Sequence, residues 1–159
     1  MRLKDKVAVV TGAASGFGRG IAELFAAEGA RVVIADINGE AAAALVAEIG
    51  PDRAIATATD VTRRADVDAM IAAAVDRFGG VDILINNAGV THKTQSLLTV
   101  SEDDFDRIYA VNVKSIYLTT LAVVPAMEKR GGGSIITTAS TAGLRPRPGL
   151  TWYNGSKGA

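Results

Sequence analysis

The chain has 159 residues, of which 48% are hydrophobic and 5% aromatic, and its formal net charge at pH 7 is zero. This length suffices for one domain with a sizeable core, and the neutral charge without a basic run argues against nucleic acid or an anionic membrane surface as the main partner. The sequence holds no cysteine and one histidine, His92, which excludes disulfides and thiolate metal sites and argues against a histidine metal site or catalytic triad.

Strand-like and helix-like segments alternate along the chain. The first six residues carry no apolar signal region and no apolar run reaches the length of a bilayer span, so we expect a cytoplasmic protein. The alternation implies right-handed βαβ crossovers and a parallel sheet covered on both faces. The expected strands are 7–10, 31–35, 53–59, 82–85 and 134–138, and the expected helices are 19–28, 40–49, 65–78 and 101–130, with a loop at 91–100.

A glycine-rich stretch, Thr11–Gly18, lies between the first expected strand and the first helix. This order aims a helix N-terminus, with its unpaired N–H groups and positive dipole end, at a phosphate. Gly12, Gly16 and Gly18 would permit a tight turn, a close approach of the backbone to the ligand and close helix–strand packing. A glycine cluster alone is equally compatible with an ordinary turn.

Asp36 ends the second expected strand, eighteen positions beyond Gly18. An acidic side chain at an offset of roughly 20 residues can accept hydrogen bonds from both adenosine ribose hydroxyls, and it would repel a 2′-phosphate. Ser15, inside the glycine loop, adds no positive charge to compensate. The pattern favours NAD over NADP, and the alternative is an aspartate that only caps the loop after the strand.

Tyr153 and Lys157 are four residues apart, so on a helix they share a face. A nearby ammonium favours the phenolate and makes a tyrosine a better proton-transfer group near neutral pH. Ser140, at the end of the last expected strand, could bond the substrate oxygen beside the tyrosine hydroxyl. Taken alone, a tyrosine and a lysine at this spacing are usual on a solvated helix face.

Together these motifs resemble the short-chain dehydrogenase/reductase family, and in particular its 3-oxoacyl-ACP reductase-like members. The glycine loop matches the family's cofactor fingerprint, and Asn86–Gly89 matches its fourth-strand motif. Asn112 falls where its helical catalytic asparagine belongs, and Ser140 followed by Tyr153-x-x-x-Lys157 completes the pattern. The resemblance covers residues 4–159. It implies a Rossmann-type, doubly wound parallel sheet with strand order 3-2-1-4-5.

The resemblance implies an NAD(P)-dependent oxidoreductase that moves a hydride between nicotinamide and a secondary alcohol or ketone, such as a 3-oxoacyl, sugar or steroid substrate. Tyr153 would be the general acid/base, and Lys157 would support it and bond the nicotinamide ribose. Ser140 would stabilise negative charge on the carbonyl oxygen. Asn112 would hold a water that links Lys157 to solvent; alternatively it is a buried polar residue that bonds local backbone.

The resemblance also implies a set of cofactor-binding residues, among which Asp60 and Val61 would bracket the adenine. No metal is expected. The full cofactor set is Gly12, Ser15, Gly16, Phe17, Gly18, Asp36, Asp60, Val61, Asn87, Ala88, Gly89, Tyr153 and Lys157.

Other conspicuous residues have simpler interpretations. We expect His92 in a solvated loop after the fourth strand, although it could border the cleft. The arginines of the segment 145–148 could indicate an acidic substrate, but two arginines in a proline-stiffened loop are more often surface residues. Leu144, Leu150 and Trp152 are expected to form an apolar wall of the substrate pocket.

Family members continue beyond the position of Ala159 with further helix and strands, so we expect a single domain over residues 1–159 that is incomplete at its C-terminus. The helix with Tyr153 and Lys157 would be short and weakened by glycine, and the fifth strand would be an exposed apolar edge. The competing hypothesis is a truncated nucleotide-binding fragment without catalytic activity. A methyltransferase is disfavoured because it has no need of Tyr153 and Lys157, and a homo-oligomer is expected for the full-length relative.

Overall fold

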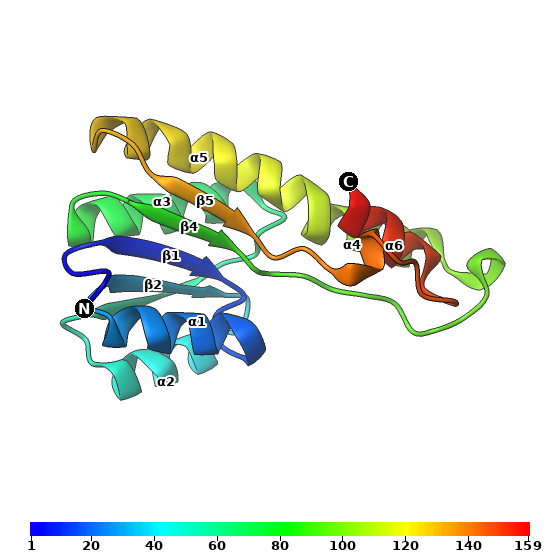
Figure 1. Ribbon diagram of the computed structural model, residues 1–159, viewed down its shortest axis with the longest axis horizontal. Helices are drawn as coiled ribbons and strands as arrows, with labels where there is room; N and C mark the ends of the chain where they lie inside the picture. The colour runs from blue at the N-terminus through cyan, green and yellow to red at the C-terminus, as the bar shows by residue number, and fades with distance from the viewer.

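The computed structural model describes residues 1–159 and contains a five-stranded parallel sheet in the order β3-β2-β1-β4-β5. The predicted doubly wound sheet and its strand order are therefore confirmed (Figure 1). The strands are β1 (Val7–Thr11), β2 (Arg31–Asp36), β3 (Ala54–Ala58), β4 (Ile83–Asn86) and β5 (Ser134–Thr137).

Helices cover both faces of the sheet (Figure 1). One face packs against α1 (Gly16–Ala27) and α2 (Gly39–Ile49), and the other against α3 (Arg64–Phe78) and α5 (Ser115–Lys129). Two further helices, α4 (Glu102–Tyr109) and α6 (Thr151–Gly158), lie together beyond the carboxyl ends of the strands. Three short turns complete the chain: η1 (Leu97–Thr99), η2 (Ala110–Lys114) and η3 (Thr141–Gly143).

The central strand β1 separates two hydrophobic clusters. All five of its residues are buried, and their side chains alternate between the two faces. Val7 and Val9 belong to the cluster under α3 and α5, whereas Val10 belongs to the cluster under α1 and α2. The continuous apolar run in the sequence is therefore explained by burial on both faces of a parallel sheet.

The predicted long helix after Ser101 contains one irregular turn. Its start is as expected, because the Ser101 hydroxyl accepts a hydrogen bond from the Asp104 N–H at 3.1 Å. At Ala110–Lys114 the backbone widens into a π-helical turn that contains Asn112. Helical structure still runs from Glu102 to Lys129, so the predicted long helix is present, with one π turn that the sequence did not indicate. Single π turns of this kind often occur at functional sites.

One helical segment, Glu102–Lys129, spans 28 residues and contains an 18-residue window of mean hydropathy 1.3. By length and composition alone it could cross a membrane, although polar residues such as Asn112 and Lys114 interrupt its apolar run. In the structure, Leu118, Val123 and Met127 of this segment belong to a core cluster. A core helix of a globular domain meets the same criteria, because one of its faces is apolar.

The glycine loop packs closely against the end of β4. Gly12 and Gly16 have positive φ angles of 61° and 52°, a conformation that favours glycine. A Cβ atom on Gly12 would lie 2.9 Å from Cα of Ala88. On Gly18 it would collide with the carbonyl oxygen of Gly12 and lie 2.5 Å from Nδ2 of Asn87. Close approach thus requires glycine at both positions.

Replacement of Gly18 should therefore destabilise the fold. We expect Gly18→Ala to lower the free energy of unfolding by about 2 kcal/mol, because the added methyl overpacks the contact between α1 and the loop. The matched control is Gly20→Ala in the same helix, where a Cβ would meet nothing within 4 Å, so helix propensity alone should raise stability by up to about 1 kcal/mol. Urea denaturation measures both, and equal effects of the two substitutions would contradict this packing argument.

The strand β5 forms an exposed edge, as predicted. It pairs only with β4, and Ile135 and Ile136 are 39% and 51% exposed. Because apolar edge strands promote association and lysine suppresses it, Ile136→Lys should reduce concentration-dependent self-association in sedimentation velocity experiments. Leu98→Lys, at an exposed apolar residue away from the sheet, is the control that should leave association unchanged. Association that falls equally in both variants would rule out the edge as its source.

Candidate functional site

A cavity of about 390 Å³ opens at the carboxyl ends of the central strands. In an open parallel sheet this is where ligands bind, at the point where the strand order reverses. The cavity draws its lining from the glycine loop, the end of β2, the segment after β3 and the end of β4. The predicted cofactor residues among its lining are Gly12, Ser15, Gly16, Phe17, Asp36, Asp60, Val61, Asn87, Ala88 and Gly89.

The carboxylate of Asp36 is held in place by two backbone groups. Its Oδ2 accepts a hydrogen bond from the N–H of Ala14, and its Oδ1 accepts one from the N–H of Asn38, both at 2.9 Å. Each carboxylate oxygen has two acceptor positions, so capacity remains on both oxygens. The side chain is therefore fixed at the cavity and still able to accept from a ligand.

The cavity wall carries no cation, since none of its lining residues is lysine or arginine. The arginine of α1, Arg19, is paired with Glu23 and Glu48. The hydrogen bond to Glu23, followed by the charge of Glu48, raises the pKa of Arg19 above its ordinary value. The charged groups of the cavity lining are therefore the two carboxylates, Asp36 and Asp60.

The floor of the cavity is a hydrogen-bonded junction between β1 and β4. The Asn87 amide donates to the carbonyl oxygens of Thr11 and Gly12 at 2.9 and 3.1 Å. The Thr11 hydroxyl oxygen accepts from the N–H groups of Asn87 and Ala88 at 3.0 and 3.1 Å. The Asn87 side-chain amide is thus committed to the glycine loop.

Asp60 and Val61 form the side of the cavity after β3. One carboxylate oxygen of Asp60 accepts from both the N–H and the hydroxyl of Thr62, at 2.9 and 2.7 Å. Its other oxygen is left for additional bonds. Val61 is 7% exposed and belongs to the buried apolar set.

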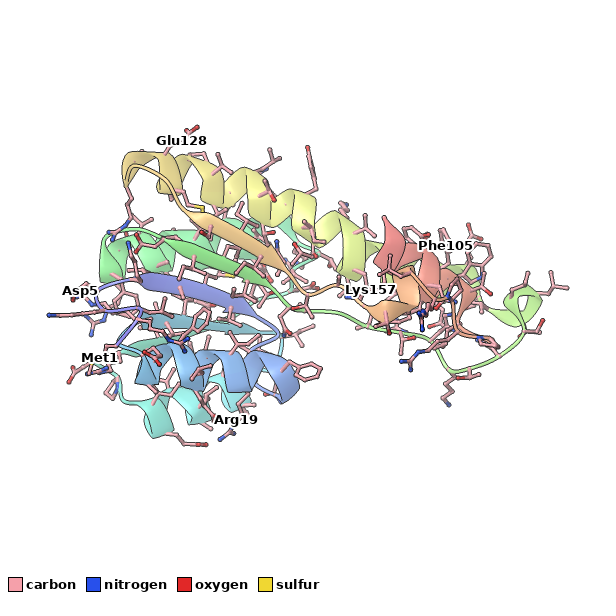
Figure 2. All side chains as sticks on the ribbon, viewed as in Figure 1. Met1, Asp5, Arg19, Phe105, Glu128 and Lys157 are labelled. Atoms are coloured by element: carbon pink, nitrogen blue, oxygen red, sulfur yellow. The ribbon has the colours of Figure 1, made fainter.

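The Lys157 side chain lies beside Gly89, a residue of the cavity lining. Its ammonium donates to the carbonyl oxygen of Thr138, just after β5, at 3.0 Å. A Cβ on Gly89 would lie 3.4 Å from both the Lys157 Nζ and the Asn112 Oδ1. Figure 2 shows Lys157 between the sheet and the outer helices. Residues predicted from distant parts of the sequence thus converge here.

The Asn112 side chain is buried and bonds the backbone of Val90, which lies 22 residues earlier in the chain. Its Oδ1 accepts from the Val90 N–H at 2.8 Å, and its Nδ2 donates to the Val90 carbonyl oxygen at 2.9 Å. Its Nδ2 also donates to the hydroxyl of Ser156 in α6 at 2.9 Å. The burial and the backbone bonds match the alternative interpretation of Asn112, although the bonded backbone is distant in sequence and not local. The water-holding role of Asn112 stays a prediction.

None of the four predicted catalytic residues, Asn112, Ser140, Tyr153 and Lys157, belongs to the cavity lining. The Ser140 hydroxyl oxygen accepts from the N–H of Ala142 at 3.1 Å and caps the turn η3. Tyr153 is half-buried in α6, one turn before Lys157. Ten of the thirteen predicted cofactor residues therefore line one cavity, whereas Gly18, Tyr153 and Lys157 lie outside its lining.

The short helix α6 is anchored by α4 and by the chain before it. Trp152 packs edge-on against Phe105 with ring centroids 5.3 Å apart, and Phe105 stacks on Tyr109 at 4.6 Å. The Asn154 amide donates to the carbonyl oxygen of Arg147 at 2.9 Å. Figure 2 shows Phe105 among these outer helices. Tertiary packing thus offsets the low helix propensity that the two glycines of this segment impose.

One expectation about the surrounding segments is wrong and one stays a prediction. Leu144 is 88% exposed and Trp152 turns toward α4, and the apolar wall that they would form with Leu150 stays a prediction. His92 is not solvated, being 4% exposed. Its loop folds back on the segment before α6, where the Gln95 N–H donates to the Gly149 carbonyl oxygen at 3.1 Å.

The buried His92 has one satisfied and one free nitrogen. Its Nδ1 lies 2.7 Å from the carbonyl oxygen of Lys93, and its Nε2 has no partner. On the neighbouring helix α4, a hydrogen bond from Arg107 is the main cause that lowers the pKa of Asp104. The arginines Arg145 and Arg147 are exposed, as expected for surface residues.

Sequence reasoning missed several residues of the site. Ile37, Thr59, Val90 and Val111 line the same cavity. Ile37 is 76% exposed. Its place directly after Asp36 was the one feature of the sequence that could have indicated its role in the cavity lining. The others are ordinary apolar or hydroxyl residues, and nothing in the sequence separates them from core positions.

Comparisons with known proteins agree with this architecture. The family described as short chain dehydrogenase matches residues 6–159. The chain is 46% identical to the 4-formylbenzenesulfonate dehydrogenase TsaC1/TsaC2 of Comamonas testosteroni, with 100% of this chain and 64% of that protein covered. It is 39% identical to the 3-oxoacyl-[acyl-carrier-protein] reductase FabG of Thermotoga maritima, with 99% and 64% covered.

A solved structure gives the same result. The 3-ketoacyl-(acyl-carrier-protein) reductase of Brucella melitensis complexed with NADH superimposes with a TM-score of 0.95 at 48% identity, with 98% of this chain and 66% of that chain covered. The chain thus spans about two thirds of the length of its relatives. With the family model covering nearly all of its residues, the chain belongs to the short-chain dehydrogenase/reductase family.

Proposed function

We propose that the cavity binds a nicotinamide dinucleotide, with NAD preferred, and that the chain carries the reactive residues of an oxidoreductase acting on a carbinol or carbonyl carbon. The observation that carries the proposal is the convergence beside Gly89, where the cavity lining approaches the Lys157 ammonium and the Asn112 amide. The Brucella melitensis relative was solved with NADH, which supports a nicotinamide cofactor.

The residues present fit such a ligand. Gly12 and Gly18 leave no room for a Cβ where the loop approaches β4, and the α1 N-terminus beside Ser15 supplies free N–H groups for a pyrophosphate. The Ser15 side chain makes no capping bond to α1. The Asp36 carboxylate has remaining acceptor capacity for ribose hydroxyls. A volume of about 390 Å³ lies within the usual range of small-ligand sites, roughly 300–1,000 Å³.

In the proposed reaction the cofactor supplies the hydride acceptor or donor. Tyr153 exchanges a proton with the substrate oxygen, and Lys157, one turn further along α6, bonds the ribose on the nicotinamide side of the cofactor. The Ser140 hydroxyl keeps a proton to donate, because its oxygen only accepts from Ala142. That proton stabilises charge on the substrate oxygen.

The substrate class is proposed only as secondary alcohols, ketones and related carbonyl compounds. Relatives of similar identity are named as dehydrogenases of 4-formylbenzenesulfonate and of sorbitol and as a reductase of 3-oxoacyl-[acyl-carrier-protein]. The compounds in these names all contain a carbinol or carbonyl carbon, but they differ in the groups attached to it. The proposed substrate class is therefore defined by that carbon alone.

A second function, nucleotide binding without turnover, is favoured by one observation. Every residue of the cavity lies between Gly12 and Val111, and neither Ser140 nor Tyr153 contributes to its lining. Cofactor binding can therefore persist without a competent substrate side. Calorimetry with NAD and a turnover assay over a panel of secondary alcohols separate the two functions: binding with turnover supports the oxidoreductase, and binding alone supports the module.

The preference for NAD depends on Asp36. We expect Asp36→Ala to weaken NAD binding about tenfold, because charge-assisted hydrogen bonds to the ribose are lost, and to narrow the difference between NAD and NADP, because the charge that repels a 2′-phosphate is gone. Asp52→Ala, at an exposed carboxylate outside the cavity, is the control. Calorimetric titration with each dinucleotide measures both effects. A wild-type preference for NADP would contradict the role assigned to Asp36.

Proton transfer is assigned to the Tyr153 hydroxyl. Its removal in Tyr153→Phe should lower turnover by a factor of about 10²–10⁴, the usual contribution of general acid–base catalysis, and leave NAD affinity unchanged. Tyr117→Phe, at a tyrosine that is 62% exposed on α5, should retain full turnover. Wild-type rates in the Tyr153 variant would refute the assigned role.

A further inference from the structure

We propose that Ser156 is a positioning residue that joins the Asn112 turn to the helix of Tyr153 and Lys157. The proposal rests on the function proposed above. Ser156 is 4% exposed, and its hydroxyl takes part in two hydrogen bonds. It accepts from the Asn112 Nδ2 at 2.9 Å and donates to the Tyr153 carbonyl oxygen at 2.8 Å.

The Asn112 amide depends on the Ser156 hydroxyl as the acceptor for one of its N–H groups. The Val90 N–H donates to the Asn112 Oδ1, and the Val90 carbonyl oxygen accepts one of the two Nδ2 protons. These two bonds fix the orientation of the amide. The second Nδ2 proton points to the Ser156 hydroxyl. Because Asn112 is 4% exposed, water cannot readily replace that acceptor, and a buried N–H without a partner is unfavourable.

The same hydroxyl bonds the backbone of α6 at Tyr153. The helix begins at Thr151 without a side-chain cap and has eight residues, so its own hydrogen bonds do not fix its position. Tyr153 precedes Ser156 by three residues and Lys157 follows it directly. A buried bond at Ser156 therefore sets the rotation of α6 relative to the π turn, and with it the direction of both reactive side chains.

The remaining anchors of α6 lie at other points and do not duplicate this bond. Trp152 contacts α4 at the start of the helix, the Asn154 side chain bonds the chain before it, and Lys157 bonds the Thr138 carbonyl oxygen at its end. None of these contacts involves Asn112. Loss of the Ser156 hydroxyl should therefore leave α6 attached while releasing the Asn112 amide.

The experiment compares three variants of the full 159-residue chain. Ser156→Ala removes the hydroxyl and Ser156→Thr keeps one. The matched control, Ser115→Ala, removes another buried hydroxyl, this one from the helical segment that contains Asn112. The Ser115 hydroxyl bonds the Val111 carbonyl oxygen at 2.6 Å and does not contact the Asn112 amide. Hydrogen exchange of the Asn112 side-chain amide, followed by ¹H–¹⁵N NMR, is the first measurement, and kcat and KM for NAD are the second.

We expect the Asn112 amide protons to exchange at least about tenfold faster in Ser156→Ala, the factor that corresponds to one ordinary hydrogen bond, and at near wild-type rates in Ser156→Thr and Ser115→Ala. For turnover we expect kcat to fall about tenfold in Ser156→Ala with KM for NAD unchanged, because Ser156 lies outside the cavity lining. The threonine variant should restore kcat.

Unchanged amide exchange in Ser156→Ala, or equal acceleration in Ser115→Ala, would overturn the proposal. A fall in kcat that Ser156→Thr fails to restore would also contradict it, because the hydroxyl would not be the group responsible. A wild-type chain without any turnover would contradict the proposed activity instead, and the exchange rates would still decide the role of Ser156.

Discussion

The junction between Asn87 and the glycine loop is the constraint on which the rest of the site depends. The Asn87 amide bonds the carbonyl oxygens of Thr11 and Gly12, and this contact is possible only because Gly18 has no Cβ to displace it. The junction brings the carboxyl ends of β1 and β4 together. Through it the N-terminus of α1 faces the cavity, and Gly89, two residues further along, reaches Lys157 and Asn112.

The sheet order explains why this junction can exist. After β1 the chain moves outward to β2 and β3, and then returns to the other side of β1 to form β4 and β5. The helices that follow β1 and β4 therefore diverge to opposite faces (Figure 1), and the loops that precede them separate into a crevice. Asp36 lies on one side of this crevice at the end of β2 and Gly89 on the other after β4, so a ligand in contact with both must extend across the sheet.

The strands and the cofactor cavity were predictable from sequence because their signals are local. Apolar runs mark buried parallel strands. The close contacts of the first loop require glycines, and their spacing can be recognised in the sequence. The features that the sequence did not indicate have a different origin. The burial of His92, the π turn at Asn112 and the orientation of Trp152 all accompany contacts between segments distant in the sequence. Asn112 illustrates the limit, since its position was predicted from the resemblance but its partners, Val90 and Ser156, have no sequence signal.

The two halves of the site differ in the physical basis of their rigidity. Gly12, Asp36 and Asn87 are held by bonds to the backbone of the sheet and its first loops, and they stay fixed as long as the sheet is folded. Tyr153 and Lys157 are held on an eight-residue helix by an aromatic contact, by the side-chain bonds of Asn154 and Ser156, and by one bond to Thr138. Segments with few buried contacts open at lower free energy than the core. The geometry of proton transfer is therefore more sensitive to a single lost contact than cofactor binding is, and a change in α6 should affect kcat before it affects affinity for the dinucleotide.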